Sequence, residues 1–204
     1  TFSDPKTIEA AKFLQDQVKK GNIEIGTDPT VTFGNGNASA LLESTGSLGG
    51  LTKSATIPFI TTYLPGPGPS AATGGAGLAV PNGISDARKK NAVKFIDFMT
   101  NTENTIKFSQ ATGYMPVRKD ALDNADERKF LDDNPNAETA IKQLNENTKP
   151  QDYARVFVPG GGKRIGGALD KITVGNQDVE QVFADLDKET QQVIDRDITP
   201  KLNK

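Results

Sequence analysis

Cysteine, histidine and tryptophan are all absent from this chain of 204 residues. Without cysteine the chain can form neither a disulfide nor a thiolate metal site. Without histidine it lacks the usual general base, the Ser-His-Asp and Cys-His catalytic arrangements and the imidazole ligands of zinc sites. An enzymatic function would have to use carboxylates, lysines, tyrosines or hydroxyls, and the sequence implies no metal and no cofactor.

The chain also lacks a large excess of charge of either sign, since 24 basic and 26 acidic residues give a net charge of -2. The chain therefore offers no basic surface for nucleic acid and no basic block typical of a membrane-surface helix. No apolar run approaches the roughly 18 residues that cross a bilayer. The chain opens with Thr1-Phe2-Ser3-Asp4, without an initiator Met or a signal peptide, which indicates a processed or truncated product.

The hydrophobic pattern predicts many helices and a few short strands, and hence an α/β fold. Helices are predicted over 3–21, 50–55, 85–100, 102–112, 126–132, 137–145, 162–172 and 178–198. Strands are predicted over 38–42, 56–63 and 77–80. The Pro- and Gly-rich range 64–74 predicts a linker or flexible loop, and 114–117 is predicted to be extended.

Two glycine-rich stretches resemble nucleotide-binding loops only superficially. Residues 34–39 half-match a dinucleotide fingerprint, but the third glycine is replaced by Ser39 and no clear strand precedes them. The stretch Gly160-Gly161-Gly162-Lys163-Arg164 lacks the first glycine of a Walker loop and has Arg164 where Ser or Thr is required. Both are better interpreted as ordinary loops.

Two other segments have features of an anion site. Ser44-Thr45-Gly46-Ser47 places hydroxyls before a short helix, and Gly161–Arg164 places an arginine at the start of another helix. Hydroxyls and free backbone N–H groups suit a phosphate or carboxylate, and a guanidinium can bind a phosphate through two hydrogen bonds. An ordinary helix cap and a solvent-facing arginine are the alternative interpretations.

Five sequence blocks occur in an order and spacing that are specific together. They are Ser-Thr-Gly-Ser-Leu-Gly-Gly-Leu-Thr-Lys at 44–53, Leu-Pro-Gly at 64–66, Gly-Gly-Ala-Gly-Leu-Ala-Val-Pro at 74–81, Ala-Val-Lys-Phe-Ile-Asp-Phe-Met-Thr at 92–100 and Ala-Thr-Gly-Tyr-Met-Pro-Val at 111–117. With these blocks the whole chain resembles the extracellular solute-binding proteins of ABC importers, in the group of the maltose- and glycerol-3-phosphate-binding proteins.

The resemblance is strongest to the glycerol-3-phosphate-binding branch, through the blocks at 44–48, 134–140 and 159–164. It implies that a solute phosphate is held by a serine of the first block, a glycine, a tyrosine and an arginine. These positions fall on Ser44, Gly75, Tyr114 and Arg164, with Ser47 as a neighbour. The arginine block departs from the family in being richer in glycine, and Arg155 is a poorer candidate for the arginine.

The resemblance also implies an architecture. The chain would be the C-terminal part of a two-lobed periplasmic-binding-protein fold (type 2, Venus-flytrap), helix-rich, from a protein about twice as long. Residues 1–63 and 113–204 would belong to the C-terminal lobe, 64–74 to a hinge or linker, and 75–112 to the N-terminal lobe. The helices that hold Phe95 and Phe108 would pack on an N-terminal lobe that is mostly missing from this chain.

The implied function is solute binding without catalysis, in a bacterial extracytoplasmic protein of the periplasm or a cell-surface lipoprotein. Its partners would be a phosphate ester, the membrane permease subunits of an ABC importer and the missing N-terminal lobe of the same protein. A di- or oligosaccharide ligand is the first alternative, although few aromatic side chains are present to stack on sugars. A carboxylate-based hydrolase and a structural or adhesion module are further alternatives.

Overall fold

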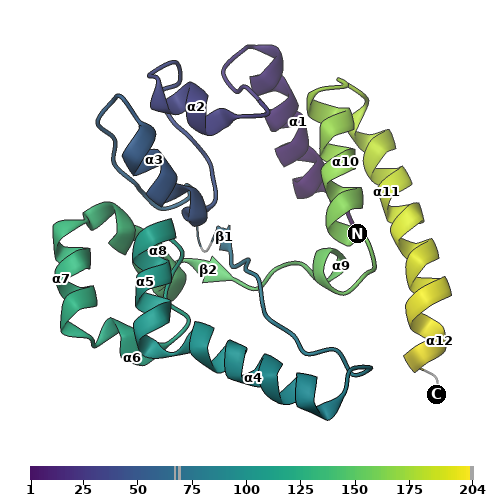
Figure 1. Cartoon of the computed structure of the whole chain (residues 1–204). Coiled ribbons are helices and arrows are strands. Elements are labelled where there is room, and N and C mark those ends of the chain that lie inside the picture. The colour runs from purple at the N-terminus through teal and green to yellow at the C-terminus, as the bar shows by residue number, and fades with distance from the viewer. Residues whose placement is uncertain (67, 69, 203–204) are drawn as a thin grey trace. The chain divides into compact units, whose positions relative to one another are not determined.

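The structure is a computed structural model that describes residues 1–66, 68 and 70–202. It divides into two compact units, each of which is described by itself. The first unit combines Thr1–Thr27 with the chain from Gln151 onward, and the second is Asp28–Pro150. Helices make up most of both units, as Figure 1 shows, in agreement with the helix-rich character predicted from the sequence.

The first unit consists of helices from the two ends of the chain. These are α1 (Pro5–Lys19), α9 (Tyr153–Val156), α10 (Gly161–Thr173), α11 (Val179–Val193), the π-helical turn η2 (Ile194–Ile198) and α12 (Thr199–Leu202). The caps explain where they begin: the side chain of Asp4 accepts a hydrogen bond from the Lys6 N–H, and that of Asp178 from the Gln181 N–H. The predicted helices at 3–21, 162–172 and 178–198 are confirmed, the last with a change to π geometry near its end.

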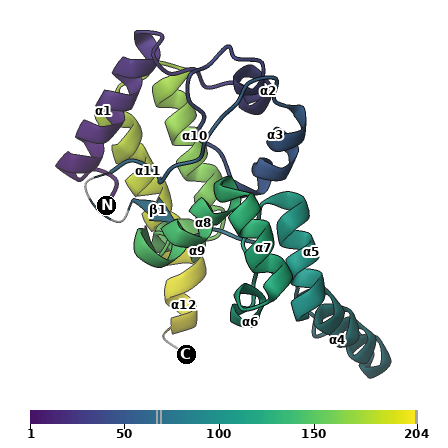
Figure 2. The same cartoon turned by 90° about the vertical axis from the view of Figure 1, so that its left-hand side faces the viewer.

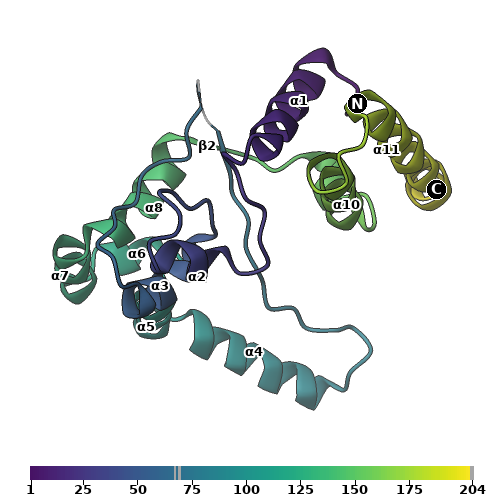
Figure 3. The same cartoon turned by 90° about the horizontal axis from the view of Figure 1, so that it is seen from above.

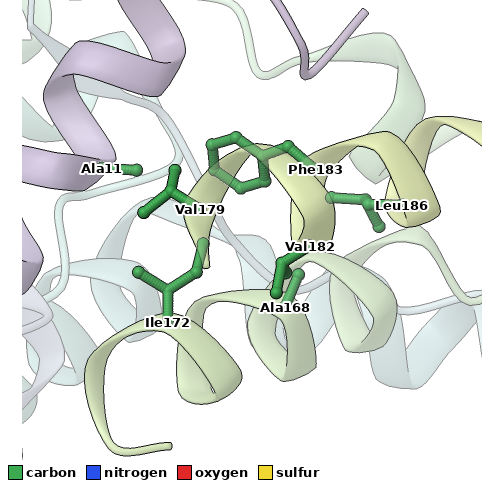
Figure 4. Packing of buried hydrophobic residues seen from close by; sticks show 7 residues of the cluster. All are labelled: Ala11, Ala168, Ile172, Val179, Val182, Phe183 and Leu186. Atoms are coloured by element: carbon green, nitrogen blue, oxygen red, sulfur yellow. The ribbon is translucent and has the colours of Figure 1, made fainter. Parts of the chain in front are cut away.

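The core of the first unit lies where α1, α10 and α11 pack together, an arrangement that Figure 2 shows from the side of α1. Its buried side chains, drawn in Figure 4, come from apolar positions at helical spacing: Ala11, Ala168, Ile172, Val179, Val182, Phe183 and Leu186. Ile172 is fully buried, and burial of such a side chain contributes about 1.5–3 kcal/mol. This small core holds three helices together across a separation of more than a hundred residues in the sequence.

Asp187 fixes the start of the chain to α11. Its carboxylate accepts hydrogen bonds from Thr1 Oγ1 (2.5 Å), the Phe2 N–H (2.6 Å), the Ser3 N–H (3.0 Å) and Ser3 Oγ (2.6 Å). Burial alone would raise the pKa of Asp187, but the hydrogen bonds from Ser3, Thr1 and Phe2 outweigh it and lower that pKa from 3.8 to about 2. The ionised form of Asp187 therefore stabilises the folded unit.

The second unit has more and shorter elements. Its helices are α2 (Pro29–Gly34), η1 (Thr45–Ser47), α3 (Leu48–Ser54), α4 (Asp86–Thr100), α5 (Thr102–Thr112), α6 (Lys119–Leu122), α7 (Ala125–Asp133) and α8 (Pro135–Glu146). Figure 3 shows α3 beside α5, which it contacts. Strands β1 (Ala71–Ala72) and β2 (Thr148–Lys149) pair in parallel, with Ala71 opposite Thr148. The helices predicted over 50–55, 85–100, 102–112, 126–132 and 137–145 are confirmed.

The strands predicted over 38–42, 56–63 and 77–80 are wrong, because none of these residues forms a ladder in the structure. In 56–63, side chains of α8 take the place of a neighbouring strand. The Thr61 N–H donates to Asn136 Oδ1 at 2.9 Å, and Asn136 Nδ2 donates to the Phe59 carbonyl at 3.2 Å. The β-branched and aromatic composition thus identified a segment that needs partners without identifying the partner.

The predicted linker 64–74 contains β1, and residues 67 and 69 within it lie outside the described residues. The predicted lobe boundaries concern a longer protein, whereas the two compact units reflect contacts within this chain alone. The division into 1–63, 64–74, 75–112 and 113–204 therefore stays a prediction. Among the described helices, none has the length and apolar composition needed to cross a membrane.

We expect Asp187→Asn to destabilise the first unit at neutral pH by about 1 kcal/mol, a value reduced for the solvent around this partly exposed group. Because the folded pKa of Asp187 is lower than the unfolded value, the stabilisation is present above about pH 4 and is lost as the pH falls toward 2. Urea unfolding across this range should show wild type and variant converging in acid. Asp170→Asn, at an exposed position of α10, is the control. A difference that does not change with pH would contradict this role of Asp187.

Candidate ligand-binding site

The loop that holds Ser44 and Ser47 is ordered by local hydrogen bonds. Ser44 caps η1, where its Oγ accepts from the Gly46 N–H at 3.3 Å and its carbonyl accepts from the Ser47 N–H at 3.0 Å. The Glu43 carboxylate accepts from the Ser44 N–H at 2.7 Å. Ser44 is exposed, and Ser47 precedes α3 without a side-chain capping bond among the described residues. The loop thus presents two hydroxyls from a fixed backbone.

Tyr114 follows the end of α5 directly. Gly113 ends that helix in the left-handed region, with φ +90°, and turns the chain back. Ser109 Oγ then donates to the Tyr114 carbonyl at 2.6 Å. The Tyr114 ring stacks on Phe108, with centroids 6.0 Å apart and ring planes 4° from parallel. Both rings are about half exposed, 49% for Phe108 and 44% for Tyr114.

Close glycine contacts join the Ser44–Ser47 loop to Tyr114. A Cβ atom added to Gly46 would lie 2.6 Å from Tyr114 Cε2 and 2.8 Å from its Oη, so a side chain fits there only if the Tyr114 ring moves. A Cβ at Gly113 would lie 2.6 Å from the Thr45 carbonyl oxygen and 2.7 Å from Leu48 Cβ. The sequence blocks at 44–53 and 111–117 therefore meet in space, and they bring Ser44, Ser47 and Tyr114 into one cluster.

Gly75 does not join this cluster. It lies in an exposed stretch outside the helices and strands, and a Cβ added there would meet no atom within 4 Å. Gly75 has no side chain that could obstruct its backbone N–H. The structure places Gly75 in open surroundings, and its assignment to a ligand site stays a prediction.

Arg164 lies in the first turn of α10, in the other compact unit, so its surroundings are described separately. Its Nη2 donates to the Pro159 carbonyl at 2.8 Å, which fixes one side of the guanidinium. Its Nε is buried and has no hydrogen-bond partner among the described residues. Arg155, the poorer candidate, donates through Nη1 to Gln151 Oε1 at 2.7 Å. Arg164 therefore differs from Arg155 in having a buried donor that no described residue pairs.

A hollow of about 320 Å³ lies between α10 and α11 beside Arg164. The charged side chains that line it are Lys163, Arg164, Lys171, Asp185 and Glu189. A hollow with three cations attracts an anion, while its two carboxylates oppose a highly charged one. The described residues contain no group of three or more acidic side chains placed to hold a metal ion.

Phe108 and Gly46 also belong to this cluster, and the sequence predicts no contact of either residue with Tyr114. Phe108 was predicted only to pack on a missing lobe, and Gly46 was one glycine of a longer block. The one available signal was the Gly113-Tyr114 pair after a helix, since a left-handed glycine returns the next side chain toward the last turn. That signal predicts that the Tyr114 ring lies near α5, but it does not predict which residues the ring contacts.

A model of the family of bacterial extracellular solute-binding proteins matches residues 2–139. The match extends over more than half of the chain, and it includes the Ser44–Ser47 loop, Gly75 and Tyr114. The chain belongs to the bacterial extracellular solute-binding protein family.

Two curated relatives carry the name sn-glycerol-3-phosphate-binding periplasmic protein UgpB. The chain is 29% identical over 203 residues to the protein of Pectobacterium atrosepticum and 28% identical over 203 residues to that of Escherichia coli K12. Each alignment covers 95% of this chain and 44% of the relative, so the chain spans less than half of their length. The periplasmic relatives agree with the predicted extracytoplasmic localisation.

A solved structure is similar over nearly the whole chain. It is the crystal structure of UgpB from Mycobacterium tuberculosis in complex with glycerophosphocholine, with a TM-score of 0.92 and 45% identity. The match covers 98% of this chain and 51% of that one. The predicted fold is thus confirmed: the chain has the helix-rich fold of part of a periplasmic binding protein.

We expect Gly113→Ala to lower the free energy of unfolding of the second unit by more than about 1 kcal/mol, because the left-handed backbone alone costs that much for alanine. The new methyl would also collide with Thr45 and Leu48. Gly50→Ala is the matched control, since Gly50 lies inside α3 with nothing within 4 Å of an added Cβ. Urea denaturation should show a loss for the first variant and little change or a gain for the second. Equal stabilities would contradict the close contact.

Proposed function

We propose that this chain is part of the substrate-binding component of an ABC importer. The component binds a phosphate ester, such as glycerol-3-phosphate or a glycerophosphodiester, and delivers it to the permease in the membrane. The observation that carries this proposal is the 45% identity, over 98% of the chain, to a UgpB solved with glycerophosphocholine. The proposal concerns a protein longer than this chain.

The residues proposed to hold the phosphate supply complementary donors. Ser44, Ser47 and Tyr114 provide hydroxyls from one cluster, Gly75 provides a backbone N–H, and Arg164 provides a guanidinium. Neutral donors together with a single cation suit a monoester or diester, whose negative charge is small. The unused Nε of Arg164 supports its part in this set, because a buried donor is costly to leave unpaired.

Binding without catalysis is the second part of the proposal. Membership of a solute-binding family supports it, and so does a sequence without histidine or cysteine. A carrier has to release its solute unchanged, so it needs hydrogen-bond donors but no nucleophile and no general base. A turnover assay on phosphate esters tests this part, and measurable hydrolysis by the purified protein would overturn it.

The third part concerns the missing portion of the protein. Helix α4 has no buried residue, and its Val93, Phe95 and Phe98 are 48%, 54% and 58% exposed. Phe95 and Phe98 are three residues apart and so share one face of α4, and large apolar side chains exposed together usually lie at an interface. We propose that this face packs against an N-terminal lobe, in the part of the longer protein that this chain does not cover. Ligand contacts from both lobes would then stabilise the closed state through a hinge motion.

We expect isothermal titration of the full-length protein to show binding of glycerol-3-phosphate and of glycerophosphodiesters, and no binding of maltose. A sugar remains the alternative ligand within the same family. This chain has no tryptophan and only three tyrosines with which to stack on a sugar. Clear binding of a sugar without binding of any phosphate ester would overturn the proposed solute and leave the family membership intact.

We expect Arg164→Ala to weaken binding of phosphate esters by about 10- to 100-fold, since a charge-assisted hydrogen bond contributes about 1.5–3 kcal/mol. Arg155→Ala is the control: it removes a nearby guanidinium that is already bound to Gln151. Titrations of both variants should show the loss only for Arg164→Ala. An unchanged affinity in that variant would remove Arg164 from the site.

A further inference from the structure

Two residues restrain the ring of Tyr114, and neither of them has a polar side chain. Phe108 lies parallel to it at a centroid distance of 6.0 Å. The Cα of Gly46 faces the phenol end, where an added Cβ would come within 2.8 Å of Oη. The backbone is held as well, because Ser109 Oγ donates to the Tyr114 carbonyl at 2.6 Å.

We infer that Phe108 and Gly46 are positioning residues that fix the Tyr114 hydroxyl for contact with the solute phosphate. This inference rests on the proposed function, because the Tyr114 hydroxyl is one of the donors proposed there to hold the phosphate. Neither residue supplies a donor through its side chain, and both act through the ring of Tyr114.

The exposure of the two rings supports positioning over ordinary core packing. In this chain alone Phe108 is 49% exposed and Tyr114 is 44% exposed, so their contact adds little to the buried core of the second unit. An exposed tyrosine normally exchanges among rotamers, which moves its hydroxyl by several ångströms. A parallel aromatic neighbour on one side and a glycine without a side chain on the other select one orientation. A donor ordered before binding loses less conformational entropy when the ligand arrives.

The two contacts also explain a pairing in the sequence. Phe108 precedes Tyr114 by six residues, with the left-handed Gly113 between them, so the ring of Tyr114 returns over the last turn of α5. Gly46 comes from a block more than sixty residues earlier, and the same block carries Ser44 and Ser47. A residue larger than glycine at position 46 would displace the phenol from its place beside the Ser44–Ser47 loop.

The test uses the full-length protein and the substitution Phe108→Leu, which keeps an apolar side chain and removes the aromatic face. We expect affinity for glycerol-3-phosphate, measured by calorimetry, to fall about three- to tenfold. Phe108→Tyr should restore a stacked ring and most of the affinity. Phe13→Leu, the same change at an exposed position of α1, is the matched control and should have no effect.

A readout that does not depend on ligand follows the ring itself. In protein labelled with 3-fluorotyrosine, the Tyr114 signal in a ¹⁹F spectrum can be assigned by its loss in Tyr114→Phe. Phe108→Leu should shift and broaden that signal, whereas Phe13→Leu should leave it unchanged. Gly46→Ala should shift it as well, and Gly50→Ala, inside α3 with open space around it, should not.

A double-mutant cycle separates positioning from a structural role. In a Tyr114→Phe background no hydroxyl remains to be oriented, so Phe108→Leu should cause little further loss of affinity. Equal losses in both backgrounds, or an unchanged affinity and an unchanged ¹⁹F signal in Phe108→Leu, would overturn the inference. A wild-type protein that binds no phosphate ester would overturn the proposed function and this inference with it, whereas the other outcomes leave the proposed function standing.

Discussion

Close packing at two glycines is the constraint on which the second unit's candidate site depends. Gly46 and Gly113 leave the space in which the Ser44–Ser47 loop and the start of the Tyr114 segment approach each other. Because a Cβ at either position would meet atoms at less than 3 Å, the geometry tolerates no larger residue without movement. The loop that carries Ser44 and Ser47 and the ring of Tyr114 are neighbours as a result.

The helices could be predicted from the sequence because their signals are local. Asp4 and Asp178 cap their helices, and Gly113 ends α5 in a left-handed turn. Each of these residues lies within a few positions of the apolar pattern of its helix. The strands could not be predicted, because a strand is defined by a partner that the local sequence does not name. Residues 56–63 have the composition of a strand, yet the Asn136 side chain of α8 pairs the Thr61 N–H and the Phe59 carbonyl.

The residues of the candidate site show the same difference between local signals and contacts that depend on tertiary structure. Hydroxyls near a helix start and an arginine after a glycine turn are chemical signals, and they identified Ser44 and Arg164 without reference to any family. Tyr114 and Gly75 were reached only through resemblance, since one tyrosine or glycine in a loop carries no signal of its own. Phe108 and Gly46 were missed because a ring contact between separate elements follows from tertiary packing, which no spacing in the sequence records.

The first unit is built from both ends of the sequence, with residues 28–150 between them. Helix α1 can bury its apolar face only against α10 and α11, which lie beyond that whole segment in the sequence. Until that contact forms, its apolar stripe is accessible to water and to other chains. The three-helix core of the first unit therefore closes a loop of more than a hundred residues, and its burial of apolar surface must offset the conformational entropy which that closure costs.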